Sequence, residues 1–198
     1  MTAGAGAAAL GGDAPLRYSR TAMALHWLIA ALIVANLLLG FFHEDFAKPV
    51  RTSMMWWHKS IGLSILALTL VRLGWRLGHR PPPFDAVLKP WEVRVARAAH
   101  WLFYLLLLVI PLSGWLLVST NARATSFFGL FDVGALPVSR ARDVHEAFEK
   151  IHELLGYAML ALLTLHVVGA LKHHFEGHRH LVGRMAPWVR VGNPPPPA

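Results

Sequence analysis

The chain has no cysteine among its 198 residues, and only 15% of its residues are charged. Without thiols it forms no disulfide, no thiolate metal site and no cysteine-ligated iron–sulfur cluster. With 55% hydrophobic residues, eight Trp and ten Phe, the composition is typical of a membrane protein rather than of a soluble globular domain. The first sixteen residues lack a basic start and a long apolar core, so we expect no cleaved secretion signal there.

Four segments are apolar enough to cross a membrane, for which a helix needs about 20 residues. They are residues 23–42, 57–77, 93–118 and 147–170. The expected fold is therefore all-α, an integral membrane four-helix bundle that occupies residues 17–186 as one domain. Residues 1–16 are expected to be a disordered Ala/Gly-rich lead, and residues 187–198 a Pro-rich tail.

Basic residues are distributed unequally between the two ends of this bundle. With four spans, both termini and the loop between the second and third spans share one side. That side carries a net charge of +8, whereas the opposite side sums to zero. Because cytoplasmic loops collect Lys and Arg, both termini are predicted to be cytoplasmic in a bacterial inner membrane. Topology and anionic lipid headgroups explain this charge, so we expect no nucleic-acid partner.

Four histidines lie at or inside the apolar segments: His26, His58, His152 and His166. Ionisable side chains in hydrocarbon usually have a function, and imidazole is a common ligand of iron. His152 and His166 are fourteen residues apart, which separates them by about 21 Å along a helix and leaves them about 40° from the same face. By depth, His26 pairs with His166 on the cytoplasmic side, and His58 pairs with His152 on the outer side.

Two opposed histidine pairs favour two b-type haems, each held by two axial imidazoles. A structural zinc site usually has four ligands, and each depth here offers only two strong candidates. For any single histidine, a core or interfacial role is the alternative, and His145, seven residues before His152, is the main rival as outer ligand. A histidine-lined metal or proton transporter without haem is a further alternative.

Two basic residues are candidates for contacts beside these pairs. Arg72 is fourteen residues from His58, so it shares that helix face at the depth of the inner pair. Its guanidinium could hold a haem propionate or contact a quinone, or the side chain could simply snorkel to the interface. Lys59, directly after His58, is the first candidate to guide an anionic donor to the outer site, and a solvated side chain is its alternative.

Four segments, in this order, resemble the prokaryotic cytochrome b561 family: RYSRTAMALHWLIA, HKSIGLSILALTLVRLGWRL, AHWLFYLLLLVIPLSGWLL and HELLGYAMLALLTLHVVGALKHHF. The resemblance covers residues 17–175, and it depends on HW, VRL, PLSG and two histidines fourteen residues apart with a trailing HH. It implies a four-helix inner-membrane bundle with two bis-histidine b haems. The family's ligand positions match His26, His58, His152 and His166.

The resemblance also implies a function. Similar small members are superoxide oxidases, which pass an electron from superoxide outside to ubiquinone near the cytoplasmic side. Their quinone-contact histidines match His100 and His173. Other relatives are cytochrome b subunits of hydrogenases and formate dehydrogenases. We therefore expect a superoxide:ubiquinone oxidoreductase, and the alternative is a non-catalytic electron-transfer subunit that links a periplasmic or dehydrogenase partner to the quinone pool.

Overall fold

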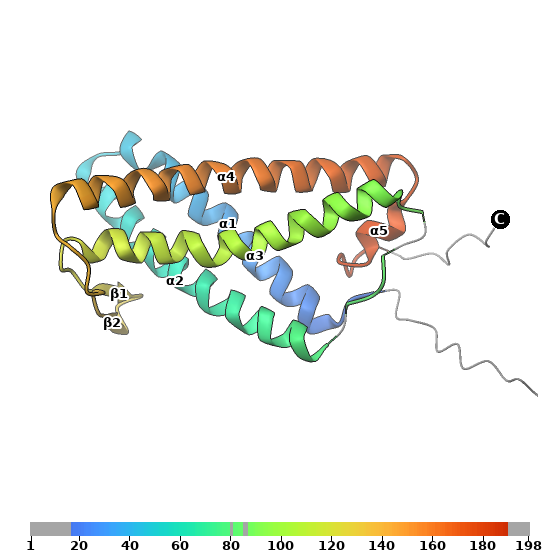
Figure 1. Ribbon diagram of the computed structural model, residues 1–198, viewed down its shortest axis with the longest axis horizontal. Helices are drawn as coiled ribbons and strands as arrows, with labels where there is room; N and C mark the ends of the chain where they lie inside the picture. The colour runs from blue at the N-terminus through green and yellow to red at the C-terminus, as the bar shows by residue number, and fades with distance from the viewer. Residues whose placement is uncertain (1–16, 80, 85–86, 190–198) are drawn as a thin grey trace, which may run out of the picture.

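The computed structural model describes residues 17–79, 81–84 and 87–189, and its main feature is a bundle of four long helices (Figure 1). These helices are α1 (Arg20–Phe42), α2 (Lys48–Gly78), α3 (Pro90–Ser119) and α4 (Arg142–Phe175). Each is long and apolar enough to span a membrane. The prediction of four apolar helices is confirmed. The predicted lead and residues 190–198 of the predicted tail lie outside the described residues.

All four helices begin earlier than the hydropathy predicts, and two of them, α2 and α4, begin more than one turn earlier. α2 starts nine residues before the apolar segment at position 57, and α4 starts five residues before the one at position 147. The additional turns hold exposed polar residues such as Lys48, Arg51 and Arg142. Hydropathy marks only the apolar part of a helix, whereas backbone hydrogen bonding continues through these polar turns beyond it.

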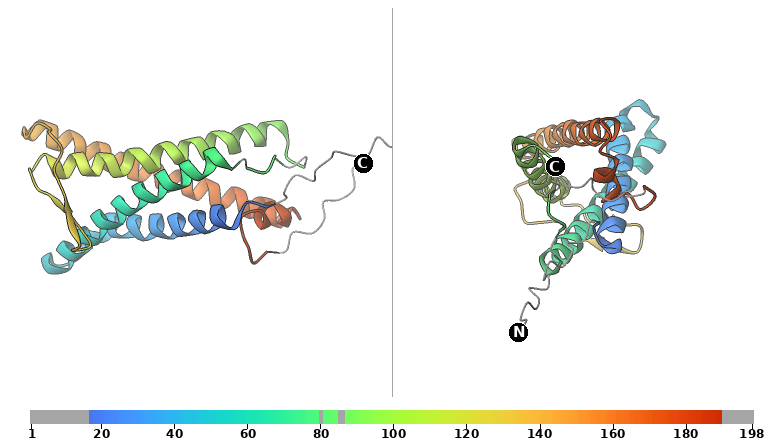
Figure 2. Two further views of the ribbon diagram at one scale, coloured as in Figure 1. Left: turned by 90° about the horizontal axis from the view of Figure 1, so that it is seen from below. Right: turned by 90° about the vertical axis from the view of Figure 1, so that its right-hand side faces the viewer.

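The connection between α3 and α4 contains a short antiparallel hairpin that the expectation of an all-α protein missed. Its strands are β1 (Thr125–Phe127) and β2 (Phe131–Val133), with Thr125 opposite Val133. The turn between them includes Gly129 at φ +75°, a conformation that favours glycine. Figure 2 shows this connection crossing one end of the bundle, so the protein is mostly helical rather than all-α.

The helices pack as two antiparallel pairs, α1 with α2 and α3 with α4, and α2 contacts α3 between them. A small apolar core joins all four: Ile29, Ile33, Ile65, Leu106, Leu107, Met159 and Leu162. On α4, its members lie between His152 and His166 in the sequence. Much of the outer surface is apolar and exposed, including Leu154 and Leu165, which lipid would cover.

The chain returns to α1 after α4. A short helix, α5 (Arg179–Gly183), leads into a segment whose carbonyls accept hydrogen bonds from the start of α1. The indole N–H of Trp27 donates to the Met185 carbonyl at 2.9 Å, and the Trp27 and Trp188 rings lie 4.9 Å apart. Both described ends of the chain therefore lie at one end of the bundle, called the terminal end below. The opposite end is called the hairpin end.

Candidate functional site

Two histidines face each other near the hairpin end. His58 of α2 and His152 of α4 have ring centroids 6.0 Å apart and ring planes at 89°. Two imidazoles bound to one metal ion by bonds of about 2 Å have centroids about 6 Å apart. Both side chains are only partly buried. This is the pair that helix depth predicted on the outer side.

Hydrogen bonds select one tautomer for both rings of this pair. Nδ1 of His58 lies 3.1 Å from the Asn36 carbonyl, which only accepts, so Nδ1 carries the proton. Nδ1 of His152 lies 2.9 Å from the Ser113 hydroxyl. That hydroxyl donates its own proton to the Ile110 carbonyl at 2.8 Å, so its oxygen accepts from the imidazole. Nε2 of each ring is left with a lone pair, as a metal ligand requires.

Two glycines make room for the same rings. A Cβ atom at Gly40 of α1 would lie 3.0 Å from Cε1 of His58, and one at Gly114 of α3 would lie 2.9 Å from Cε1 of His152. Contacts this short force a neighbour to move. The two imidazoles therefore pack against helix backbone that carries no side chain at Gly40 and Gly114. In these positions their Nδ1 atoms reach hydrogen-bond acceptors.

The second pair lies toward the terminal end. His26 of α1 and His166 of α4 have ring centroids 6.4 Å apart. Phe103 packs edge-on against the His166 ring at 5.2 Å, and the His100 ring lies 6.0 Å from it. Within the described residues, neither His26 nor His166 has a hydrogen-bond partner on its ring. The pairing matches the one predicted from depth, and the ligand role of these residues stays a prediction.

Both pairs fit a haem better than a bare metal ion. Among the described residues, no group of three or more His, Asp or Glu side chains converges as a metal site. Two imidazoles alone leave most coordination positions of a transition metal unfilled, whereas a porphyrin supplies four nitrogen ligands in a plane between them. The ring separations of both pairs agree with imidazoles that would hold such a group. In the outer pair, the Nε2 lone pairs and the glycine contacts agree with it as well.

His145, the predicted rival of His152, lies in a similar arrangement without an opposing ring. Its Nδ1 is 2.6 Å from the Thr120 hydroxyl, which donates to the Leu117 carbonyl at 2.7 Å. These residues are seven positions from His152, Ser113 and Ile110 along their helices, so the hydroxyl–histidine contact is repeated. Within the described residues, no second imidazole contacts His145. The geometry favours His152.

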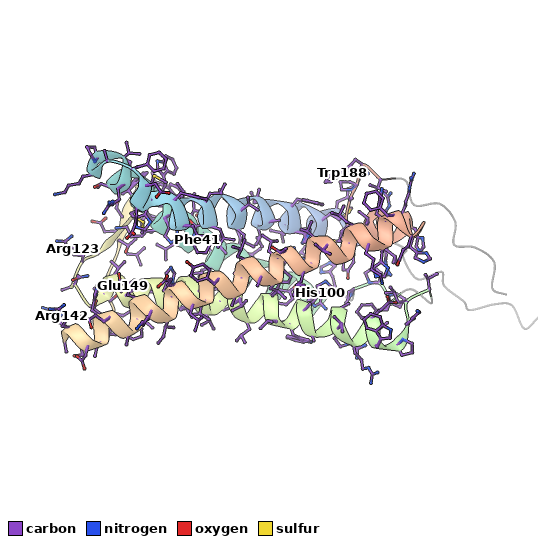
Figure 3. The ribbon with its side chains drawn as sticks, turned by 90° about the horizontal axis from the view of Figure 1, so that it is seen from above. Phe41, His100, Arg123, Arg142, Glu149 and Trp188 are labelled. Atoms are coloured by element: carbon purple, nitrogen blue, oxygen red, sulfur yellow. The ribbon has the colours of Figure 1, made fainter. Side chains whose placement is uncertain are left out.

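A cavity of about 280 Å³ opens at the terminal end between α2 and α3. Its walls include Arg76, Arg97, His100 and Tyr104. Figure 3 shows His100 on the same half of the bundle as Trp188, with Arg123 and Arg142 at the opposite end. The cavity therefore lies beside the His26–His166 pair, because His100 lines the cavity and its ring lies 6.0 Å from the His166 ring.

Arg72 and His173, two further predicted contacts, do not line this cavity. Arg72 donates from Nε to the Tyr104 hydroxyl at 3.4 Å, so it reaches across to α3. Nδ1 of His173 is buried, lies 3.6 Å from the Glu176 carboxylate and has no hydrogen-bond partner among the described residues. No described contact joins His173 to His100. The structure thus associates Arg72 with the cavity wall and separates the two predicted quinone histidines.

Comparisons with known proteins identify the family. The family model of prokaryotic cytochrome b561 matches residues 17–188. Cytochrome b561 homolog 2 of Escherichia coli is 32% identical over 87% of this chain and 93% of the relative. The chain belongs to the prokaryotic cytochrome b561 family. A protein of Yersinia pestis named probable superoxide oxidase CybB is 27% identical over 88% of the chain and 98% of the relative. Cytochrome b562 of Cereibacter sphaeroides is 29% identical over 85% of this chain and 94% of the relative.

Membership of the cytochrome b561 family explains the four apolar helices and gives a context for the histidine pairs. The family consists of multi-pass inner-membrane proteins that transfer electrons with b-type haem. This chain is therefore oxidoreductase-like, and the match extends over both histidine pairs and the cavity. It does not determine the haem count, the donor, the acceptor or the orientation.

Sequence reasoning missed several residues of this cytochrome b561 site. Ser113 enters the sequence analysis only as part of PLSG, and Asn36 and Gly40 are not singled out there. A glycine inside an apolar helix was a usable signal, since glycine there needs a packing reason. Lys59, the predicted guide for anions, is half-buried and has no ion-pair partner among the described residues.

Proposed function

We propose that this protein carries electrons across the inner membrane through two b-type haems. One would be held by His58 and His152, and the other by His26 and His166. The observation that carries the proposal is the pair of opposed imidazoles at each end, with ring centroids 6.0 and 6.4 Å apart. With both axial positions filled, the haem supplies outer-sphere one-electron chemistry. The protein's part is to orient the imidazoles and to exclude water.

Both termini are proposed to be cytoplasmic. The terminal end carries the charge excess of +8 in the sequence, and loops rich in Lys and Arg stay on the cytoplasmic side. The hairpin end then faces the periplasm, and His58 and His152 form the outer site.

Superoxide is the proposed donor at the outer site. The name of the Yersinia pestis relative, probable superoxide oxidase CybB, supports this choice. Lys59 follows the ligand His58 and has no carboxylate partner among the described residues, so its charge is available to attract an anion. Since the whole outer face sums to zero, local placement of this charge has to supply the steering.

Ubiquinone is the proposed acceptor at the terminal end. The cavity beside His100 is large enough for a quinone head group, and an imidazole N–H can donate to a quinone carbonyl. Arg72 is proposed to hold a propionate of the inner haem or the quinone from the α2 side. His173 remains a proposed quinone contact because its buried Nδ1, 3.6 Å from the Glu176 carboxylate, has no hydrogen-bond partner in the described residues.

A non-catalytic electron-transfer subunit is the second candidate. Two relatives carry names without any substrate, cytochrome b561 homolog 2 and cytochrome b562. The outer face has a net charge of zero, which is equally compatible with a protein partner and with a small anion.

The test uses purified protein in detergent with ubiquinone and a superoxide source. We expect superoxide-dependent quinone reduction that slows with added salt, because steering of an anion is screened. Lys59→Glu should slow reduction of the outer haem by superoxide at least several-fold while haem content stays unchanged, and Lys150→Glu on the outer part of α4 serves as the charge-matched control. If stopped-flow mixing shows no more haem reduction than a denatured sample, the superoxide assignment fails and the subunit role replaces it.

A further inference from the structure

α1 and α3 present the same backbone feature to the two outer histidines. On α1, the acceptor carbonyl of Asn36 precedes Gly40 by four residues. On α3, the carbonyl of Ile110 precedes Gly114 by four residues. The difference is that a side-chain hydroxyl, that of Ser113, lies 2.9 Å from Nδ1 of His152 and itself donates to the Ile110 carbonyl. Each outer ring therefore has one glycine contact and one route to a backbone carbonyl.

The Ser113 hydroxyl is a stronger acceptor than an isolated serine. It is 5% exposed, and its proton is committed to the Ile110 carbonyl at 2.8 Å. Donating that hydrogen bond polarises the oxygen, so the contact of 2.9 Å from His152 Nδ1 is strengthened in turn. Ser113 thus fixes both the tautomer and the rotation of the His152 ring.

Such a hydrogen bond changes the basicity of the imidazole as a ligand of iron. When Nδ1–H donates to a good acceptor, electron density at Nε2 increases and the ligand becomes more basic. A more basic axial ligand stabilises the ferric form, so the reduction potential falls. Both outer rings have such an acceptor, whereas neither His26 nor His166 has a ring hydrogen bond among the described residues.

We propose that Ser113 is a positioning residue that holds His152 as the Nδ1–H tautomer and lowers the potential of the outer haem below that of the inner one. Electron transfer from the hairpin end to the terminal end then runs downhill. This inference rests on the proposed haem ligation. It adds the direction of electron transfer between the two haems and names a residue that influences this direction.

The experiment is a potentiometric titration of the purified holoprotein, followed by the visible absorption of each haem. In Ser113→Ala, we expect the lower of the two midpoint potentials to rise and the higher one to stay in place. Ser113→Thr keeps the hydroxyl and should restore the wild-type value. Thr120→Ala is the matched control, because it removes the equivalent hydroxyl from His145 and should move neither midpoint.

Two unchanged midpoints in Ser113→Ala with both haems retained overturn the inference, and a shift of the higher midpoint overturns the proposed order of potentials. If Ser113→Ala loses one haem, the lower midpoint potential is measured in Ser113→Cys instead, since sulfur is a weaker acceptor than the hydroxyl oxygen. A raised lower midpoint in that variant supports the role, and an unchanged one refutes it. Absence of haem from the wild-type protein would instead refute the proposed function.

Discussion

Gly114 and Ser113 are neighbours on α3 that act on the same imidazole in different ways. Ser113 offers an oxygen to Nδ1 of His152, and Gly114 offers the space in which Cε1 lies. Ser113 is recognisable only from the structure. A serine in an apolar helix usually bonds to a carbonyl of its own helix, and Ser113 does so too. Its second contact depends on how α4 packs.

Gly114→Ala should disturb the outer site although alanine favours a helix. The helix propensity of alanine stabilises by about 1 kcal/mol, and crowding in a packed interior costs about 1–3 kcal/mol. Because the new Cβ would lie 2.9 Å from the His152 ring, we expect reduced haem content or an altered spectrum of one haem. The haem-to-protein ratio and the visible spectrum are the measurements.

Gly74→Ala is the control for this substitution. Nothing lies within 4 Å of a Cβ at Gly74 on α2. This variant should keep both haems and melt at the same temperature as the wild type or slightly higher. Equal spectra and equal haem content in the two variants would show that Gly114 is not a seat for His152.

At the scale of elements, the α3–α4 connection is fastened across the hairpin end. The Ser60 hydroxyl of α2 accepts from the Phe128 amide at 3.2 Å, and the Ser119 hydroxyl of α3 accepts from the Leu136 amide at 3.0 Å. Trp115 adds a bond from its indole N–H to the Gly134 carbonyl at 3.0 Å. The connection therefore covers the end of the bundle next to His58.

The helices were predictable, and this connection was not. An apolar run of about 20 residues marks a span on its own. Strands of three residues carry no period to detect, and their positions depend on hydroxyls of α2 and α3. The polar first turns of α2 and α4 were missed for the same reason, because no apolar pattern marks them.

Ser60→Ala should loosen the hairpin without unfolding the bundle. The change leaves the Phe128 amide without its acceptor, which costs about 1–3 kcal/mol where the group stays buried. Hydrogen–deuterium exchange should become faster by an order of magnitude or more in residues 125–133 and stay unchanged in the middle of α1 and α4. Ser64→Ala is the control, because the Ser64 hydroxyl donates to the Ser60 carbonyl of its own helix and has no contact with the hairpin among the described residues. Equal exchange in both variants would contradict the fastening role.

At the scale of the whole molecule, the two histidine pairs lie at opposite ends of one apolar core. Helix geometry predicted this from the sequence, because a fixed rise per residue converts a fourteen-residue spacing into depth. The terminal end was less predictable. His100 and His173 were expected together, but His100 lines the cavity, whereas His173 belongs to the last turn of α4 and lies beside Glu176. Lateral packing of helices and the return of residues 184–189 onto α1 decide such contacts.

Each histidine pair is proposed to hold one b-type haem, and the number of haems per chain is the decisive measurement. Pyridine haemochromogen assays on the purified protein should give two haems per chain in the wild type and in His145→Ala. His152→Ala and His166→Ala should each retain one, with the loss in different spectral components. A wild type without haem, or two low-spin haems retained in either His152→Ala or His166→Ala, would contradict the account.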